Sequence, residues 1–114
     1  MKALLTSVII LVSNATWAEP PALNCDQGPA HKIFGGTPWL IYACNDKRSV
    51  VAVTAEGSPA AEFYFMFTYS NDTYRLYGEG TGNKAKTDEA YGQLSKLTEN
   101  EIEDLYVEAS SAVK

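Results

Sequence analysis

Residues 63–69, which run Phe-Tyr-Phe-Met-Phe-Thr-Tyr, decide the fold of this chain. The odd-numbered residues of this stretch are all aromatic, and Tyr64, Met66 and Thr68 lie between them. Successive side chains of a strand point to opposite faces, so an alternation of this kind indicates a β-strand. Aromatic residues also favour strands by propensity. The stretch therefore predicts a strand with one strongly aromatic face.

Three further strands are predicted around this one. Residues 39–44 and 50–54 are rich in apolar and β-branched residues, and a polar connection joins them. A tight turn at residues 70–72 leads from the aromatic strand into a fourth strand at residues 73–77. Connections this short suit antiparallel neighbours, because parallel pairing needs long crossovers. The sequence thus predicts a four-stranded antiparallel meander.

Two helices are predicted after a glycine-rich connection. The first is expected to begin near Thr87, and the second begins at Thr98 and Glu101, which have the spacing of a capping box. In both segments the apolar residues recur at helical spacing, which gives each helix one apolar stripe. These stripes need a surface to cover, and the aromatic face of the sheet is available. We therefore expect an α+β fold in which the meander packs under two C-terminal helices.

Residues 1–18 have the features of a cleavable secretory signal. Lys2 is followed by an apolar run at residues 3–12 and then by small and polar residues up to Ala18. The apolar run is shorter than the roughly 20 residues needed to span a bilayer, so no membrane anchor is expected after cleavage. The expected product is a periplasmic or secreted protein that begins at Glu19.

Residues 19–38 are rich in proline and glycine and show little periodicity, which predicts an irregular N-terminal arm. The sequence contains two cysteines, Cys25 in this arm and Cys44 in the first predicted strand. In an oxidising compartment an even pair of cysteines is expected to be bonded. A Cys25–Cys44 disulfide would attach the arm to a single α+β domain at residues 39–114.

Charge and motif content argue against several functional classes. The whole chain has a net charge of −5, and removal of Lys2 with the signal makes it −6. This balance disfavours binding to nucleic acid or to an anionic membrane, but it permits a basic protein partner. His31 and the two distant cysteines do not match the ligand spacing of a zinc site. We expect neither a metal nor another cofactor.

The sequence also offers no pattern typical of a catalytic site. The glycine-rich segment 78–84 has Asn83 and Ala85 where a Walker loop needs glycine and a hydroxyl residue. The acidic residues of the predicted helices fall at positions expected to be exposed, which does not suggest an opposed pair of carboxylates. We therefore expect a protein that is not an enzyme.

Some side chains that often form protein–protein contacts are expected on the sheet face away from the helices. They are Tyr42, Tyr64, Met66, Arg75 and Tyr77. The simpler expectation is that the arm covers this face as a second small core, through Leu23, Ile33 and Phe34. The alternative is that the face is exposed and binds a protein partner.

These features favour a small exported binding protein without catalytic activity. In size, acidity and disulfide content the chain resembles small exported bacterial inhibitors and immunity proteins, which implies an envelope enzyme as the partner. An accessory or structural subunit of an envelope complex is the alternative, and it predicts an exposed sheet edge or apolar patch. An enzyme with an unrecognised site would instead show a deep pocket lined by side chains with strongly shifted pKa values. The identity of the partner and the oligomeric state remain open.

Overall fold

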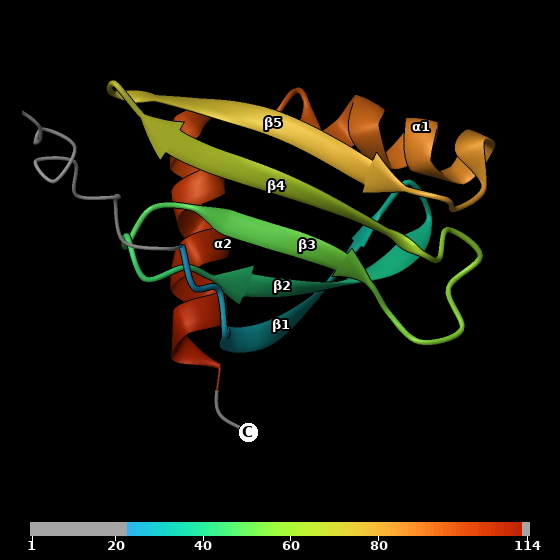
Figure 1. Ribbon diagram of the computed structural model, residues 1–114, viewed down its shortest axis with the longest axis horizontal. Helices are drawn as coiled ribbons and strands as arrows, with labels where there is room; N and C mark the ends of the chain where they lie inside the picture. The colour runs from blue at the N-terminus through green and yellow to red at the C-terminus, as the bar shows by residue number, and fades with distance from the viewer. Residues whose placement is uncertain (1–22, 113–114) are drawn as a thin grey trace, which may run out of the picture.

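The computed structural model describes residues 23–112, and the predicted signal peptide lies outside these residues. Five strands precede two helices along the chain (Figure 1). The elements are β1 (Gln27–Phe34), β2 (Thr37–Ala43), β3 (Val50–Thr54), β4 (Phe63–Ser70), β5 (Thr73–Gly80), α1 (Lys84–Leu94) and α2 (Glu99–Ser111). The strands form one sheet in the order β1-β2-β3-β4-β5, and every neighbouring pair is antiparallel. The α+β class and the antiparallel meander are therefore confirmed.

The prediction of four strands is wrong, because the sheet has five. The additional strand, β1, lies in the segment expected to be irregular and pairs with β2. Gly35 and Gly36 form the two-residue turn between β1 and β2, and their φ angles are 61° and 75°. Positive φ at both positions suits the turns that join antiparallel strands, and glycine adopts it without steric cost. Pro29 lies where the β1–β2 register shifts, as proline in strands commonly does. The glycine and proline that suggested irregular chain thus belong to a hairpin.

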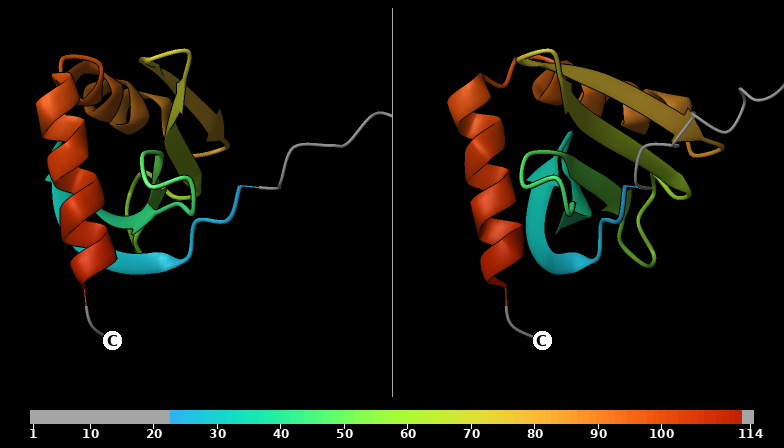
Figure 2. Two further views of the ribbon diagram at one scale, coloured as in Figure 1. Left: turned by 90° about the vertical axis from the view of Figure 1, so that its left-hand side faces the viewer. Right: turned by 60° about the vertical axis from the view of Figure 1, so that its left-hand side comes forward.

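Both helices lie on the same side of the sheet (Figure 2). The core fills the space between the helices and the aromatic face of β4, where Phe65 and Phe67 are buried. Leu94 of α1 and Ile102 of α2 contribute to the same core. The predicted packing of the helices on the aromatic face is therefore confirmed.

Trp39 occupies the middle of this core and is completely buried. Its ring lies 5.3 Å from the ring of Phe65, measured between centroids. Its indole N–H donates to the backbone oxygen of Phe34 and to Oγ1 of Thr37, each at 3.1 Å. A buried indole N–H without a partner would cost free energy, so these bonds let the large ring enter the core. They also hold the end of β1 beside the start of β2.

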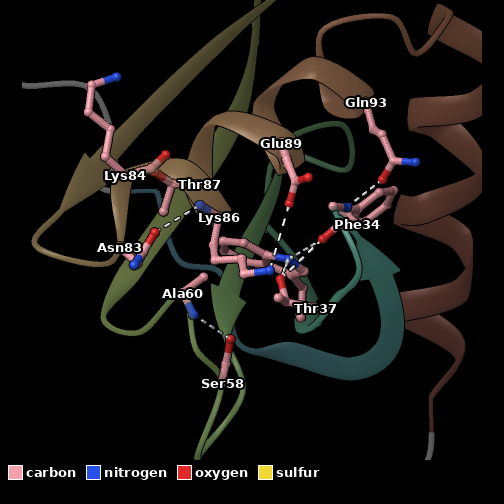
Figure 3. Close-up of polar contacts among 12 residues, drawn as sticks. Phe34, Thr37, Ser58, Ala60, Asn83, Lys84, Lys86, Thr87, Glu89 and Gln93 are labelled. Carbon is pink, nitrogen blue, oxygen red and sulfur yellow. Dashed lines mark hydrogen bonds and ion pairs between the residues drawn. The ribbon is translucent and has the colours of Figure 1, made fainter.

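The two helices begin at side chains that accept hydrogen bonds from their first turns. The predicted capping box is confirmed, because Thr98 Oγ1 accepts from the N–H of Glu101 and Glu101 Oε1 accepts from the N–H of Thr98. Helix α1 begins at Lys84, earlier than the expected start near Thr87. Its cap is Asn83, whose Oδ1 accepts from the N–H of Lys86 at 3.1 Å (Figure 3). Apolar periodicity does not reveal a polar cap of this kind.

The β1–β2 turn packs directly on α1. The N–H of Gly35 donates to Oε1 of Gln93 at 2.5 Å, and Figure 3 shows the Gln93 side chain directed at the turn beside Phe34. A Cβ atom at Gly35 would lie only 2.5 Å from the backbone nitrogen of Ala90. This position therefore needs glycine both for its positive φ and for the close approach of the helix.

The Cys25–Cys44 disulfide is present, as predicted. It links the segment before β1 to the residue that follows β2, over a sequence separation of 19. The N–H of Asn45 also donates to the backbone oxygen of Asn24 at 2.8 Å. Closing a loop of this length stabilises the fold by about 3 kcal/mol if the effect is entropic.

The two glycines of the β1–β2 turn offer a matched test of the contact with α1. Gly35→Ala is expected to lower the free energy of unfolding by about 3 kcal/mol, because the methyl group meets the α1 backbone in addition to the unfavourable φ. Gly36→Ala is expected to cost only about 1 kcal/mol, because φ is also positive but no atom lies within 4 Å of the added Cβ. Urea unfolding of the two variants measures the difference. Equal losses would contradict the packing described for Gly35.

Candidate functional site on the open face of the sheet

The sheet face opposite the helices carries a row of apolar and aromatic side chains across four strands. Tyr42 is paired with Val51, Val51 with Met66, and Met66 with Tyr77. Residues directly opposite one another in antiparallel strands point to the same face, with Cβ atoms about 5 Å apart. In Figure 1 this face is turned toward the viewer, and α2 passes behind the sheet. The four side chains therefore form a continuous strip on the uncovered side.

A second row runs parallel to the first across all five strands. It consists of His31, Leu40, Val53, Tyr64 and Glu79, each paired with the next. The hydroxyl of Tyr64 donates to Oε1 of Glu79 at 3.3 Å. The row is apolar in the middle and polar at its two ends, where the edge strands lie.

We define the open face by the apolar and aromatic members of these two rows. They are Leu40, Tyr42, Val51, Val53, Tyr64, Met66 and Tyr77. The most accessible members are Tyr64 and Tyr77, whose exposed fractions are 40% and 51%. The other five are partly exposed. Neither helix covers this surface, since both pack on the opposite side (Figure 2).

All five residues selected from the sequence for partner contact lie on this side of the sheet. Arg75 is paired with Thr68 and stands next to the open face on the edge strand β5. Leu40, Val51 and Val53 belong to the same surface but were not selected. Alternation of strand side chains could have found them, because it puts Leu40 on the same face as Tyr42. In residues 50–54 it puts Val51 and Val53 on one face and Val50 and Ala52 on the other.

The expectation that the arm covers this face is wrong for the described residues. Leu23 and Ile33 have exposed fractions of 41% and 66%, and Phe34 joins the core on the helix side. The arm extends the sheet sideways as β1 instead of lying over it. The backbone groups of β2 gain a paired strand in this way, whereas a loop across the face would leave that edge unpaired.

An open hollow of about 490 Å³ adjoins one end of the open face. Its lining includes Val53 and Tyr64 of the open face, together with Glu62, Glu79 and Thr81. The hollow lies where β3 ends and β4 begins, beside the end of β5. It extends the open face toward a polar rim.

A polar cluster lies at the other end of the same strands. The guanidinium of Arg48 stacks over the ring of Tyr69 at 4.4 Å, and its Nη1 lies 3.3 Å from Oε2 of Glu103 on α2. The hydroxyl of Tyr74 donates to the backbone oxygen of Arg48 at 3.1 Å. Partial burial raises the pKa of Tyr74 above its ordinary value. The cluster joins the β2–β3 connection to the β4–β5 hairpin and to α2.

Asp46 organises the β2–β3 connection in this cluster. Partial burial opposes its ionisation, but hydrogen bonds from the hydroxyl and N–H of Ser49 and from the N–H of Arg48 outweigh burial and lower its pKa. The hydroxyl oxygen of Ser49 in turn accepts from the N–H of Tyr69 at 3.0 Å. The groups with shifted pKa values thus stabilise the hairpin end of the sheet and do not line the hollow.

The described residues also bear on the role of His31, on metal binding and on membrane-spanning helices. His31 is exposed on the edge strand β1. Between residues 23 and 112, no three histidine, cysteine or acidic side chains lie close enough together to hold a metal ion. No helix in the same range has the length and apolar character needed to cross a bilayer.

Comparison with known proteins shows no family for this chain. No family model and no solved structure matches it. The ATP phosphoribosyltransferase regulatory subunit of Hahella chejuensis (strain KCTC 2396) is 31% identical to it over 74 residues. The match covers 59% of this chain and 18% of the other protein, so the chain spans less than a fifth of that relative. A local similarity of this extent transfers no function.

The role of Asp46 predicts a pH-dependent loss of stability. A carboxylate whose pKa is lowered by folding stabilises the fold above its unfolded-state pKa, and this contribution disappears as the pH falls through the folded-state value. Asp46→Asn is expected to lower the free energy of unfolding by about 1 kcal/mol at pH 7, because neutral hydrogen bonds replace charged ones. The deficit should vanish near pH 2. Urea unfolding at several pH values tests this, with Asp26→Asn as the control, and a pH-independent deficit would contradict it.

Proposed function

We propose that this protein is a small exported binding protein that contacts a partner protein through the open face. The observation that carries this proposal is a contiguous apolar and aromatic surface that neither helix covers, in a domain whose other face already holds a complete core. Contiguous apolar surfaces on small domains commonly mark interaction sites. Tyrosine and methionine supply such surfaces with large contact areas, and tyrosine adds a polar group.

Export is supported by two features of the chain. Residues 1–18 have the order of a secretory signal, and the Cys25–Cys44 disulfide suits an oxidising compartment. We therefore place the mature protein in the periplasm or outside the cell.

The finer proposal is an inhibitor or immunity-type protein whose partner is a basic enzyme of the envelope. A net charge of −6 after loss of Lys2 would attract a basic partner and speed its encounter with the domain. The open face would then supply most of the contact area, with Glu79 and Arg75 at its rim. The proposal assigns no catalytic step to this chain, because the groups with shifted pKa values belong to the polar cluster around Arg48.

A second candidate function is an accessory subunit of an envelope complex. The observation that favours it is the edge strand β5, most of whose residues are exposed. An unpaired edge can accept a strand from another chain, and many assemblies are built in this way.

Partner contact through the open face can be tested with two exposed tyrosines on opposite sides of the molecule. Tyr64 lies on the open face and Tyr91 on α1, with exposed fractions of 40% and 48%. Once a partner has been purified from an envelope extract, Tyr64→Ala is expected to weaken its binding about tenfold or more in calorimetric titration, as for a central interface residue. Tyr91→Ala should leave the affinity unchanged. Failure to recover any specific partner, or equal effects of the two variants, would contradict the proposal.

Export has its own test by intact-mass analysis of protein purified from its native host. The expected species begins at Glu19 and is about 2 Da lighter than its reduced form, because one disulfide is present. Full-length protein that retains residues 1–18 and two free thiols would exclude an exported protein.

A further inference from the structure

The two edges of the sheet differ in how well they are protected. At one edge, β1 contains Pro29, which lacks an N–H group, and a register shift between Gln27 and Ala30. At the other edge, β5 pairs with β4 without interruption over eight residues and contains no proline or lysine. Proline, lysine and bulges are devices that keep edge strands from pairing with other chains. The β5 edge has neither a proline nor a register shift, and its charged side chains are Arg75 and Glu79.

The free backbone groups of β5 can be assigned from its hairpin. Asn71 and Asp72 form a two-residue turn with positive φ angles, so the closing pair Ser70 and Thr73 exchange their backbone hydrogen bonds. Odd-numbered residues of β5 therefore bond to β4, and the N–H and C=O groups of the even-numbered residues point away from the sheet. Within residues 23–112 these outward groups have no backbone partner. The β5 edge is thus a row of outward backbone groups without backbone partners, regular over Tyr74, Leu76 and Gly78 and altered at Gly80, whose φ is 147°.

Two charged side chains are placed symmetrically on this strand. Arg75 lies two residues before Tyr77, and Glu79 lies two residues after it. All three side chains point to the uncovered side of the sheet, because their partners on β4 are Thr68, Met66 and Tyr64. The strand therefore has a positive and a negative charge at equal distances from a central tyrosine.

We propose that β5 pairs antiparallel with β5 of a second copy of this chain, with Tyr77 opposite Tyr77 of that copy. In this register Arg75 lies opposite Glu79 of the second copy, and the two-fold symmetry forms the same pair a second time. Leu76 then lies opposite Gly78 of the second copy, and this pair and its symmetry mate form about four backbone hydrogen bonds. Tyr74 opposite Gly80, again twice, adds up to about four more. The two sheets become one continuous sheet.

Neighbouring registers do not satisfy these charges. A register must change by two residues to keep even-numbered residues opposite one another. If the register shifts by two residues, Arg75 lies opposite Tyr77 or Thr81. If it shifts by four residues, Arg75 lies opposite Arg75 of the second copy, or Glu79 lies opposite Glu79. Like charges directly opposite are destabilising, whereas opposite charges are favourable. Only the register centred on Tyr77 pairs Arg75 with Glu79.

A second copy is favoured over an unrelated strand because the charge pattern of β5 is complementary to itself. Helix α1, which follows β5 in the chain, lies on the same side of the sheet as α2 (Figure 2). The backbone pairing uses the edge of the sheet, but Arg75, Tyr77 and Glu79 also border the open face, so the dimer would extend that face across two copies.

Charge reversal tests the register directly. Sedimentation of the mature protein from about 10 µM to about 1 mM in 150 mM salt is expected to show a monomer–dimer equilibrium. Glu79→Arg or Arg75→Glu each turns both charge pairs repulsive and should weaken dimerisation about 10- to 100-fold. The double variant restores the pairs with reversed signs and should dimerise within about threefold of the unaltered protein. Urea unfolding at concentrations where all variants are monomeric checks that they fold alike.

A monomer throughout this range would overturn the proposal. Single reversals without effect, or a double variant as weak as the single ones, would also overturn it.

Cysteine cross-linking tests the two-fold axis independently. In a non-hydrogen-bonded pair the Cα atoms lie about 4.5 Å apart, within the span of a disulfide. Tyr77→Cys is therefore expected to form a covalent dimer on mild oxidation. Thr73→Cys is the control, because the two Thr73 positions would be about 27 Å apart in this register. Cross-linking of Thr73→Cys as fast as that of Tyr77→Cys would contradict the proposed axis.

Discussion

The whole arrangement depends on the burial of Trp39 with its indole N–H satisfied. The oxygen of Phe34 and the hydroxyl of Thr37 accept from this group only because the chain reverses at Gly35 and Gly36. The same reversal brings the turn against α1, where it contacts the helix backbone. A large side chain in the core thus requires a tight hairpin, and the hairpin in turn sets the position of a helix.

This constraint leaves the two faces of the sheet with different roles. The helices, Trp39 and the phenylalanines of β4 fill one side. β1 pairs with β2, and the turn that follows it contacts α1, so β1 does not fold over the open face. The tyrosines of the uncovered side are consequently accessible, and the polar cluster around Arg48 holds β4 and β5 in place beside them. A stable core on one side therefore coexists with a surface available for binding on the other.

Local patterns predicted the elements whose structure depends on neighbours in sequence. The aromatic alternation in residues 63–69 predicted β4, and the Thr98–Glu101 pair predicted the start of α2. The same approach missed β1, because glycine and proline content does not distinguish a hairpin turn and a register shift from irregular chain. It also misplaced the start of α1, since the cap at Asn83 lies outside the apolar stripe. In the candidate site, alternation placed the five selected side chains on the correct face but did not identify all of their neighbours.

The sequence by itself determined the strand periodicities, the helix cap and the cysteine pair, because each of these needs only short-range geometry or two reactive side chains. Only the tertiary structure decided that Tyr42, Met66 and Tyr77 lie in one row and that β1 extends the sheet instead of covering this row. Cross-strand register and coverage of a face arise from contacts between residues far apart in the chain, whose free energies no local pattern records.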